Sequence, residues 1–203
     1  MVLIMSRGAY AQILTEFLPI LIFFVAGQLY SFFTAAIVLI ASTLVSLTIS
    51  LLYFRKIPIM PLFSGSMVFL FGGLTVYFQQ PDFLIFSSSL YFFALAMVIG
   101  VFFARKKHLL EHMFGITFAM TKAGWNILSR RWLLALLLAG IGNEIVRFAF
   151  TPEFWIQYRF FSILLLAGFA VYQFRLSRQY RIPAESNSWG LRTDPLSTPT
   201  LER

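Results

Sequence analysis

Residues 17–54 contain no charged side chain, and this long apolar stretch limits the folds open to the chain. A helix that crosses the hydrocarbon core of a bilayer needs about 20 apolar residues. The stretch is therefore too long for one crossing, and we divide it near Ser31 into a short segment, residues 17–30, and a full span, residues 33–54. As a helix the short segment is only about 21 Å long, and it carries Pro19 near its start. It is interfacial, re-entrant or a thin, tilted span.

The composition of the whole chain also indicates an integral membrane protein. Of the 203 residues, 59% are hydrophobic and 12% are charged, whereas an average soluble domain has about 25% charged residues. So few charges cannot cover the surface of a water-soluble domain of this size. The 25 Phe and 4 Trp residues exclude disorder. The absence of Cys excludes a disulfide scaffold, a thiolate metal site and a cysteine nucleophile.

Four further apolar runs, separated by charged or proline-containing breaks, predict the remaining spans. They cover residues 59–78, 83–104, 132–150 and 156–174. The expected fold class is all-α, a polytopic transmembrane helical bundle with five spans, or six if residues 17–30 cross the membrane. Residues 1–182 are expected to form a single membrane domain. The polar tail over residues 183–203 is rich in Ser, Thr and Pro, and we expect it to be a disordered cytoplasmic tail.

Lysine and arginine residues gather on one side of this topology. The chain has 16 Lys and Arg against 8 Asp and Glu, a net charge of +8. Thirteen of the sixteen basic residues fall in loops that alternate to the same side, whereas the opposite loops carry Asp82 and Glu153. Because cytoplasmic loops are enriched in Lys and Arg, this side and the C-terminus are predicted to be cytoplasmic. The positive charge therefore reports topology and does not indicate nucleic-acid binding.

Residues 106–125 are predicted to form a cytoplasmic amphipathic helix. Apolar residues recur there at three- and four-residue spacings, with the charged residues largely opposite. Such a helix lies at the interface with its basic face toward anionic lipid, or it docks a cytoplasmic partner. The plain alternative is a solvated linker helix. The candidate residues that face lipid or a partner are Lys106, Lys107 and Lys122.

His108 and His112 belong to a segment, HLLEH, that formally matches the H-x-x-E-H pattern of inverted zinc peptidases. A peptidase also needs a third ligand and a closed polar cleft, which a membrane-surface helix between lysines does not offer. No phosphate loop, nucleophile elbow or dinucleotide fingerprint occurs in a credible setting. We therefore expect no enzyme activity, no metal and no cofactor.

Asn143, Glu144 and Arg147 are the candidate intramembrane polar residues. Glu144 and Arg147 have opposite charges and share one helix face at positions i and i+3. Charges at membrane depth usually mark function or face the bundle interior. A structural pair near the outer surface, joined by Arg159, is favoured here over a transport site.

Small residues at regular spacing predict where helices approach one another closely. The candidates for helix packing are Ser42, Ser46, Ser50, Gly72 and Gly73. Three tryptophans near predicted span ends are expected to anchor the protein at the interface. They are Trp125, Trp132 and Trp155.

Four short motifs follow one another along the chain with compatible spacing. They are residues 12–19 (QILTEFLP), 71–78 (FGGLTVYF), 106–109 (KKHL) and 154–161 (FWIQYRFF). Together they resemble the bacterial septation protein A family, also called inner membrane-spanning protein YciB. The resemblance implies a five-span inner-membrane protein of Gram-negative bacteria, with a part in cell envelope biogenesis, septation and membrane integrity. It also implies contacts with cell-division and cell-elongation membrane proteins, and no catalytic residues or cofactor.

The leading interpretation is a non-enzymatic membrane scaffold. Its expected partners are membrane lipids and membrane proteins of cell division and elongation, and a homo-oligomer is compatible with the sequence. The alternative is a small solute transporter or channel that uses Asn143, Glu144 and Arg147.

Overall fold

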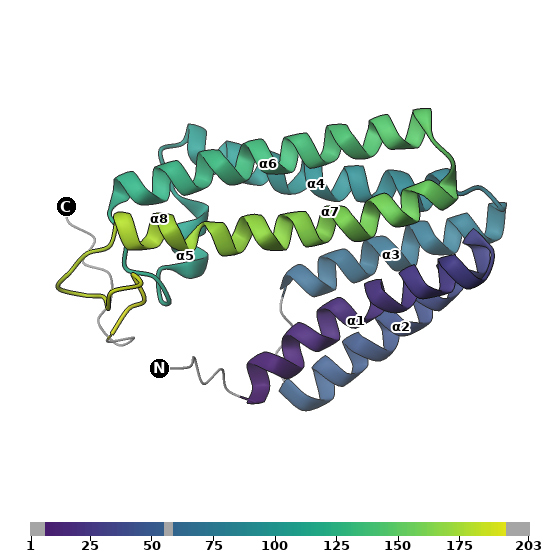
Figure 1. The fold of residues 1–203 in the computed structure, drawn as a ribbon, viewed down its shortest axis with the longest axis horizontal. Coiled ribbons are helices and arrows are strands. Elements are labelled where there is room, and N and C mark those ends of the chain that lie inside the picture. The colour runs from purple at the N-terminus through teal and green to yellow at the C-terminus, as the bar shows by residue number, and fades with distance from the viewer. Residues whose placement is uncertain (1–6, 55–58, 194–203) are drawn as a thin grey trace. The chain divides into compact units, whose positions relative to one another are not determined.

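The computed structural model describes residues 7–54 and 59–193, with side chains from Leu18 onward except at positions 50, 51, 53, 54, 59–61 and 64. In these ranges the regular elements are helices, drawn in Figure 1. They are α1 (Arg7–Leu29), α2 (Phe32–Phe54), α3 (Ile59–Phe78), α4 (Asp82–Ala104), α5 (Leu109–Phe114), α6 (Lys122–Ala149), α7 (Pro152–Tyr172) and α8 (Phe174–Gln179). The extended backbone found in the described ranges is limited to isolated β-bridges. The predicted all-α class is confirmed.

Four segments of the described helices are long and apolar enough to cross a membrane. They are Phe32–Ile49, Asp82–Ala104, Lys122–Ala149 and Pro152–Gln179. Each corresponds to one of the predicted spans. The remaining predicted span, residues 59–78, coincides with α3, whose apolar part among the described residues is the shorter segment Gly65–Phe78. A total of five crossings therefore stays a prediction.

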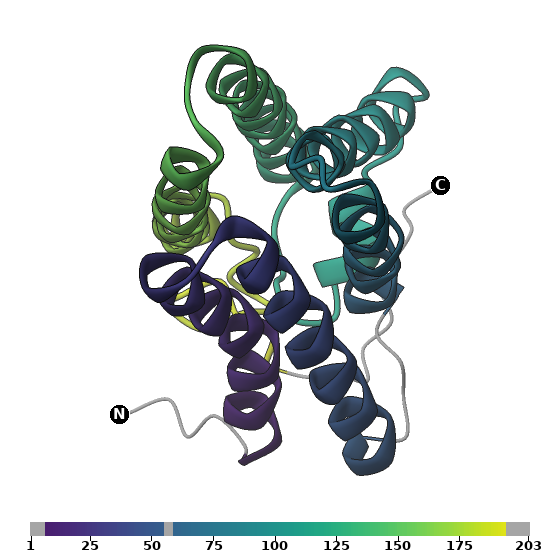
Figure 2. The same ribbon diagram turned by 90° about the vertical axis from the view of Figure 1, so that its right-hand side faces the viewer.

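The short N-terminal apolar segment is part of a longer helix than the sequence indicates. α1 has 23 residues and continues through Pro19, which membrane helices tolerate better than soluble ones. α2 then begins after a tight turn, where the Thr34 N–H donates a hydrogen bond to Ser31 Oγ at 3.3 Å and so caps the helix. α1 and α2 pack side by side as a helical hairpin (Figures 1 and 2).

The chain divides into two compact units that share three helices. The first unit is Met1–Tyr91 with Gly140–Ser162, and the second is Phe92–Ala139 with Ile163–Arg203. α4, α6 and α7 each run from one unit into the other. The single membrane domain expected over residues 1–182 stays a prediction.

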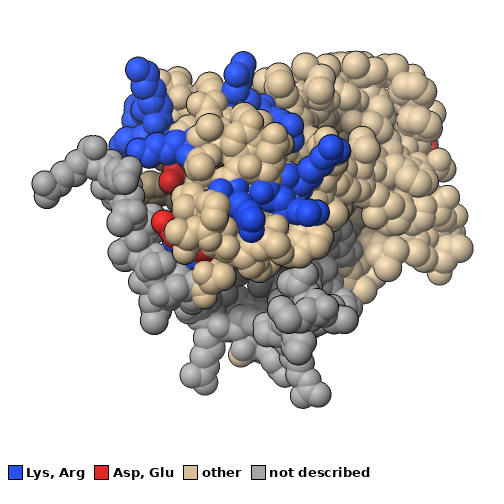
Figure 3. Space-filling view, turned by 60° about the vertical axis from the view of Figure 1, so that its left-hand side comes forward, with Lys and Arg blue, Asp and Glu red and all other residues tan. Residues whose placement is uncertain are grey.

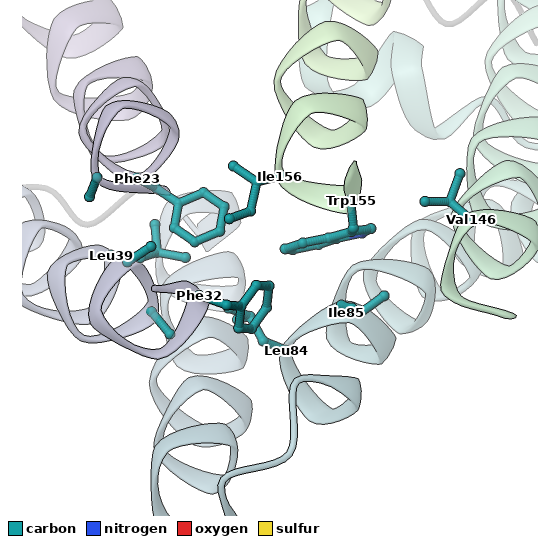
Figure 4. Packing of buried hydrophobic residues seen from close by; sticks show 11 residues of the cluster. Phe23, Phe32, Leu39, Leu84, Ile85, Val146, Trp155 and Ile156 are labelled. Atoms are coloured by element: carbon teal, nitrogen blue, oxygen red, sulfur yellow. The ribbon is translucent and has the colours of Figure 1, made fainter. Parts of the chain in front are cut away.

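The core of the first unit is built around Trp155 at the start of α7 (Figure 4). Its ring centroid lies 6.0 Å from that of Phe23 and 6.0 Å from that of Phe32. The next residue, Ile156, packs against Gly27, where a Cβ would lie only 2.5 Å from Ile156 Cδ1. Glycine at position 27 thus allows α1 to approach α7 closely.

The predicted amphipathic helix over residues 106–125 is wrong as one continuous helix. α5 ends at Phe114, and α6 does not begin until Lys122. Between them, Phe118 forms an isolated β-bridge with Leu191, and Met120 forms another with Arg181. Apolar residues do recur there at three- and four-residue spacings. The helix is nevertheless interrupted between α5 and α6, because the backbone there bonds to residues distant in sequence.

The expectation of disorder from residue 183 does not hold for residues 183–193. The Ala119 N–H donates to Gly190 O at 3.0 Å, and the Arg192 N–H donates to Thr117 O at 2.9 Å. Arg192 also forms an ion pair with Glu185. We call residues 115–121 together with residues 180–193 the clasp. The rest of the predicted tail, residues 194–203, lies outside the described residues.

Candidate functional site

Asn143 of α6 is the centre of a buried polar network in the first unit. Its Nδ2 donates to Ile85 O at 3.0 Å and to Ser89 Oγ at 2.7 Å. Its Oδ1 accepts from Trp155 Nε1 at 2.8 Å. Asn143 is 0% exposed, Ser89 is 1% exposed and Trp155 is 2% exposed. These bonds connect α6 to both α4 and α7. Breaking them would leave buried polar groups unpaired, which is costly in such surroundings.

Sequence reasoning identified Asn143 but missed its partners. The sequence predicts Trp155 as an interfacial anchor, which would face lipid. In the structure Trp155 lies in the core instead, where its indole N–H donates to Asn143. Trp125 is buried as well, at 2% exposed. The available signal was the run of three serines, 87–89, in an otherwise apolar span, because polar groups there usually face the protein interior. All three serines are buried.

A second polar contact fixes the start of α4. The Leu84 N–H donates to the hydroxyl of Thr75 in α3 at 2.9 Å, and Thr75 is fully buried. The first N–H groups of any helix lack partners within the helix. The Leu84 N–H also donates to Pro81 O at 3.1 Å, and the Thr75 hydroxyl adds an acceptor from the neighbouring helix, which joins α3 to α4.

Glu144 and Arg147, which lie one helical turn apart on α6, form an ion pair. Arg147 Nε lies 3.0 Å from Glu144 Oε2, and the two side chains are 19% and 24% exposed, respectively. The guanidinium also lies over the rings of Phe86 and Phe148, at 5.2 and 4.5 Å from their centroids. Arg159, the expected third partner, is half-buried on α7, and its joining the pair stays a prediction.

The candidate packing residues differ in their surroundings. A Cβ at Gly72 would lie 3.0 Å from two carbons of Ile40 in α2, whereas nothing lies within 4 Å of one at Gly73. Ser42 Oγ donates to Leu39 O of its own helix at 3.1 Å, and Ser46 is half-buried. The side chain of Ser50 lies outside the described residues. Of this set, Gly72 is the position where the structure brings two helices close together.

A cavity of about 200 Å³ lies between α2 and α3. Leu44, Leu47, Leu62 and Phe69 contribute to its apolar lining, and Thr43 and Ser66 are the polar residues among the described lining residues. Such a lining suits a hydrocarbon chain better than a hydrated solute.

The second unit carries most of the exposed positive charge among the described residues, and Figure 3 shows Lys and Arg side chains gathered on one face. Its exposed basic residues are Arg105, Lys106, Lys107, Lys122, Arg130, Arg175 and Arg178. The acidic residues described in this unit are Glu111 and Glu185, and the latter is paired with Arg192. All three candidate lysines, 106, 107 and 122, therefore lie on a strongly basic surface.

His108 directly precedes α5, and His112 lies in its last turn. Across residues 7–54 and 59–193, the structure brings together no group of three or more His, Asp or Glu residues that could hold a metal ion. The expected lack of a metal or cofactor stays a prediction.

The family model described as intracellular septation protein A matches residues 11–181 of the chain. The chain belongs to the intracellular septation protein A family. A relative from Erwinia tasmaniensis, named inner membrane-spanning protein YciB, is 30% identical over 169 residues, which cover 79% of this chain and 94% of the relative. Relatives of the same name from Yersinia pestis and Yersinia pseudotuberculosis are 31% identical over 155 residues, covering 75% of this chain and 86% of each relative. No solved structure matches the chain.

This membership agrees with the long apolar helices, and it identifies a helical inner-membrane protein whose relatives come from Gram-negative bacteria. The matched region ends at Arg181, which forms a β-bridge with Met120. The remainder of the clasp, residues 182–193, follows the region that the family model matches.

Proposed function

We propose that the protein is a non-enzymatic scaffold of the inner membrane, acting in cell envelope biogenesis, septation and envelope integrity by binding division and elongation membrane proteins. The observation that carries this proposal is the basic surface of the second unit, on which Lys106, Lys107 and Lys122 are exposed. Membership of the intracellular septation protein A family supports a role in septation. Such a surface attracts acidic partners and raises their rate of encounter.

The intramembrane polar residues support a structural role rather than transport. Asn143 uses both amide N–H groups and its oxygen within the bundle. Glu144 and Arg147 are paired with each other. A transport site would instead present such groups to a hydrated cavity.

The proposed orientation places the basic surface and the C-terminus in the cytoplasm, because the enrichment of Lys and Arg marks the cytoplasmic side of inner-membrane proteins. On this topology, the basic surface of the second unit faces the cytoplasmic portions of its partners.

Photo-cross-linking in living cells tests the scaffold. A photoreactive amino acid replaces Asn126, an exposed residue one turn beyond Lys122 on α6. The expected result is capture of division or elongation membrane proteins. The triple variant Lys106→Glu, Lys107→Glu, Lys122→Glu is expected to lose that capture, because like charges repel an acidic partner.

The matched control replaces the same three lysines with Arg, which keeps the charge and should keep the capture. A reporter fused to the C-terminus shows that each variant inserts in the same orientation. Unchanged capture and unchanged cell shape in the Glu variant would contradict the proposal.

A further inference from the structure

Trp189 in the clasp is an exposed aromatic residue held in place by its backbone. The carbonyl of Trp189 accepts a hydrogen bond from Ser177 Oγ at 2.8 Å, yet the residue is 52% exposed. The guanidinium of Arg178 lies 4.7 Å from the centroid of its ring. The fold thus presents an indole ring and a guanidinium together on the surface of the second unit.

The backbone contact sets the depth of Trp189 relative to the membrane. The apolar segment Pro152–Gln179 is one candidate span, and its first basic residue after Tyr172 is Arg175. Ser177 follows Tyr172 by five residues, a rise of about 8 Å. The headgroup layer on each side of a bilayer is about 5–8 Å thick. With the hydrocarbon edge of the predicted span near Tyr172, we expect Trp189 at the level of the lipid headgroups.

Basic residues of α6 lie at the same level. Arg131 Nη1 donates to Gln173 Oε1 at 3.1 Å, and the Arg131 guanidinium lies 6.0 Å from the centroid of the Tyr172 ring. Arg130, the neighbour of Arg131, is exposed. Arginines 130, 131, 175 and 178 thus lie near the ends of the predicted spans 132–150 and 156–174.

We propose that Trp189, Arg130, Arg175 and Arg178 bind the headgroups of anionic phospholipids and anchor the clasp to the cytoplasmic leaflet. Tryptophan favours the headgroup level because its ring is apolar while its N–H finds a polar partner. Arginine binds phosphate through two parallel hydrogen bonds. Each basic residue near an anionic membrane surface strengthens the binding of a protein to that membrane about fivefold. This inference does not rest on the scaffold role, because it requires lipid alone.

The test uses the full-length protein in nanodiscs of neutral phosphatidylcholine, alone or mixed with anionic phosphatidylglycerol. Hydrogen exchange is measured for backbone amides in residues 183–193. We expect exchange about fivefold slower in the anionic nanodiscs, because lipid contact holds the clasp closed. Arg178→Gln and Trp189→Ala are each expected to reduce this dependence on lipid.

Gln179→Ala is the matched control, because Gln179 is the exposed neighbour of Arg178 on α8 and carries no charge. It should keep the wild-type response to phosphatidylglycerol. If Trp189→Ala speeds exchange in both lipids, the test of lipid binding is the exchange of Arg178→Gln, because Arg178 is exposed and contacts the ring of Trp189.

Equal exchange of the wild-type segment in the two lipids would overturn the proposal. A loss of the response in Gln179→Ala equal to that in Arg178→Gln would also overturn it, by showing that the response does not depend on the charge of Arg178. Slowing by polyglutamate in neutral nanodiscs, without slowing by phosphatidylglycerol, would assign the surface to an acidic protein segment. Slowing by inorganic phosphate alone would assign it to a soluble anion.

Discussion

At the scale of single residues, the Asn143 amide joins three helices through hydrogen bonds to α4 and α7. Asn143→Ala leaves Trp155 Nε1 without its acceptor and Ser89 Oγ without its donor. We expect the free energy of unfolding to fall by about 2–4 kcal/mol, since three buried bonds are lost. Reversible unfolding of the protein in mixed micelles measures this change.

Ser162→Ala is the control for Asn143→Ala, because Ser162 Oγ donates to Arg159 O within the same helix. Its loss should change the free energy of unfolding by less than about 0.5 kcal/mol. A smaller effect for Asn143→Ala than for Ser162→Ala would show that the network contributes little to stability.

The Glu144–Arg147 pair allows the structural and transport roles to be separated. Each single change, Glu144→Leu or Arg147→Leu, leaves one charge unpaired at membrane depth and should lower the free energy of unfolding by about 1–3 kcal/mol. The double variant removes both charges and should recover most of that loss. Chemical unfolding of all three variants, compared as a double-mutant cycle, measures the coupling.

Solute flux into reconstituted vesicles provides the second measurement on this pair. A structural role predicts no flux in the wild type and none in the double variant. Flux in the wild type that disappears in the double variant would instead support a transporter.

At the scale of elements, the packing of α3 against α2 depends on Gly72. Gly72→Leu drives a side chain into Ile40, and overpacking of this kind costs about 1–3 kcal/mol. Gly73→Leu lies on the open side of the same helix and should leave the free energy of unfolding unchanged or slightly increased. Thermal unfolding of the two variants in one detergent compares them directly. Equal losses would mean that Gly72 and Gly73 have similar surroundings.

The elements also show what the sequence can predict. The spans follow from apolar length alone, because every backbone group in lipid must be bonded within its own helix. The break after α5 and the order in residues 183–193 depend on bridges from Phe118 to Leu191 and from Met120 to Arg181. Local periodicity contains no information on such distant partners. The Glu144–Arg147 pair was predictable because its members are three residues apart, whereas Ser89 and Trp155 reach Asn143 only through the fold.

At the scale of the whole molecule, the number of crossings is open to a direct test. α1 packs side by side with α2, which contains a candidate span, and this favours the six-span alternative although the apolar part of α1 is the shorter segment Leu18–Leu29. We therefore expect a topology reporter after residue 5 to report the cytoplasm. A reporter after Arg203 should report the same side, because the basic surface of the second unit precedes it.

Reporters inserted between α3 and α4, near Gln80, serve as the control and should report the outer side of the inner membrane. An N-terminal reporter on the outer side, with the other two as expected, would establish five spans and an α1 that does not cross.

The clasp also constrains the order of events during synthesis. A chain is made from its N-terminus, and its early parts fold first. The loop over residues 115–121 emerges before α6 and α7, but its backbone partners are residues 180–192, which are made after both helices. The loop must therefore wait for these partners until α7, the last candidate membrane span, has left the ribosome. Closure of the clasp then marks a chain whose final helix has been completed, and a chain that stops short of residue 180 would leave this loop open to proteases.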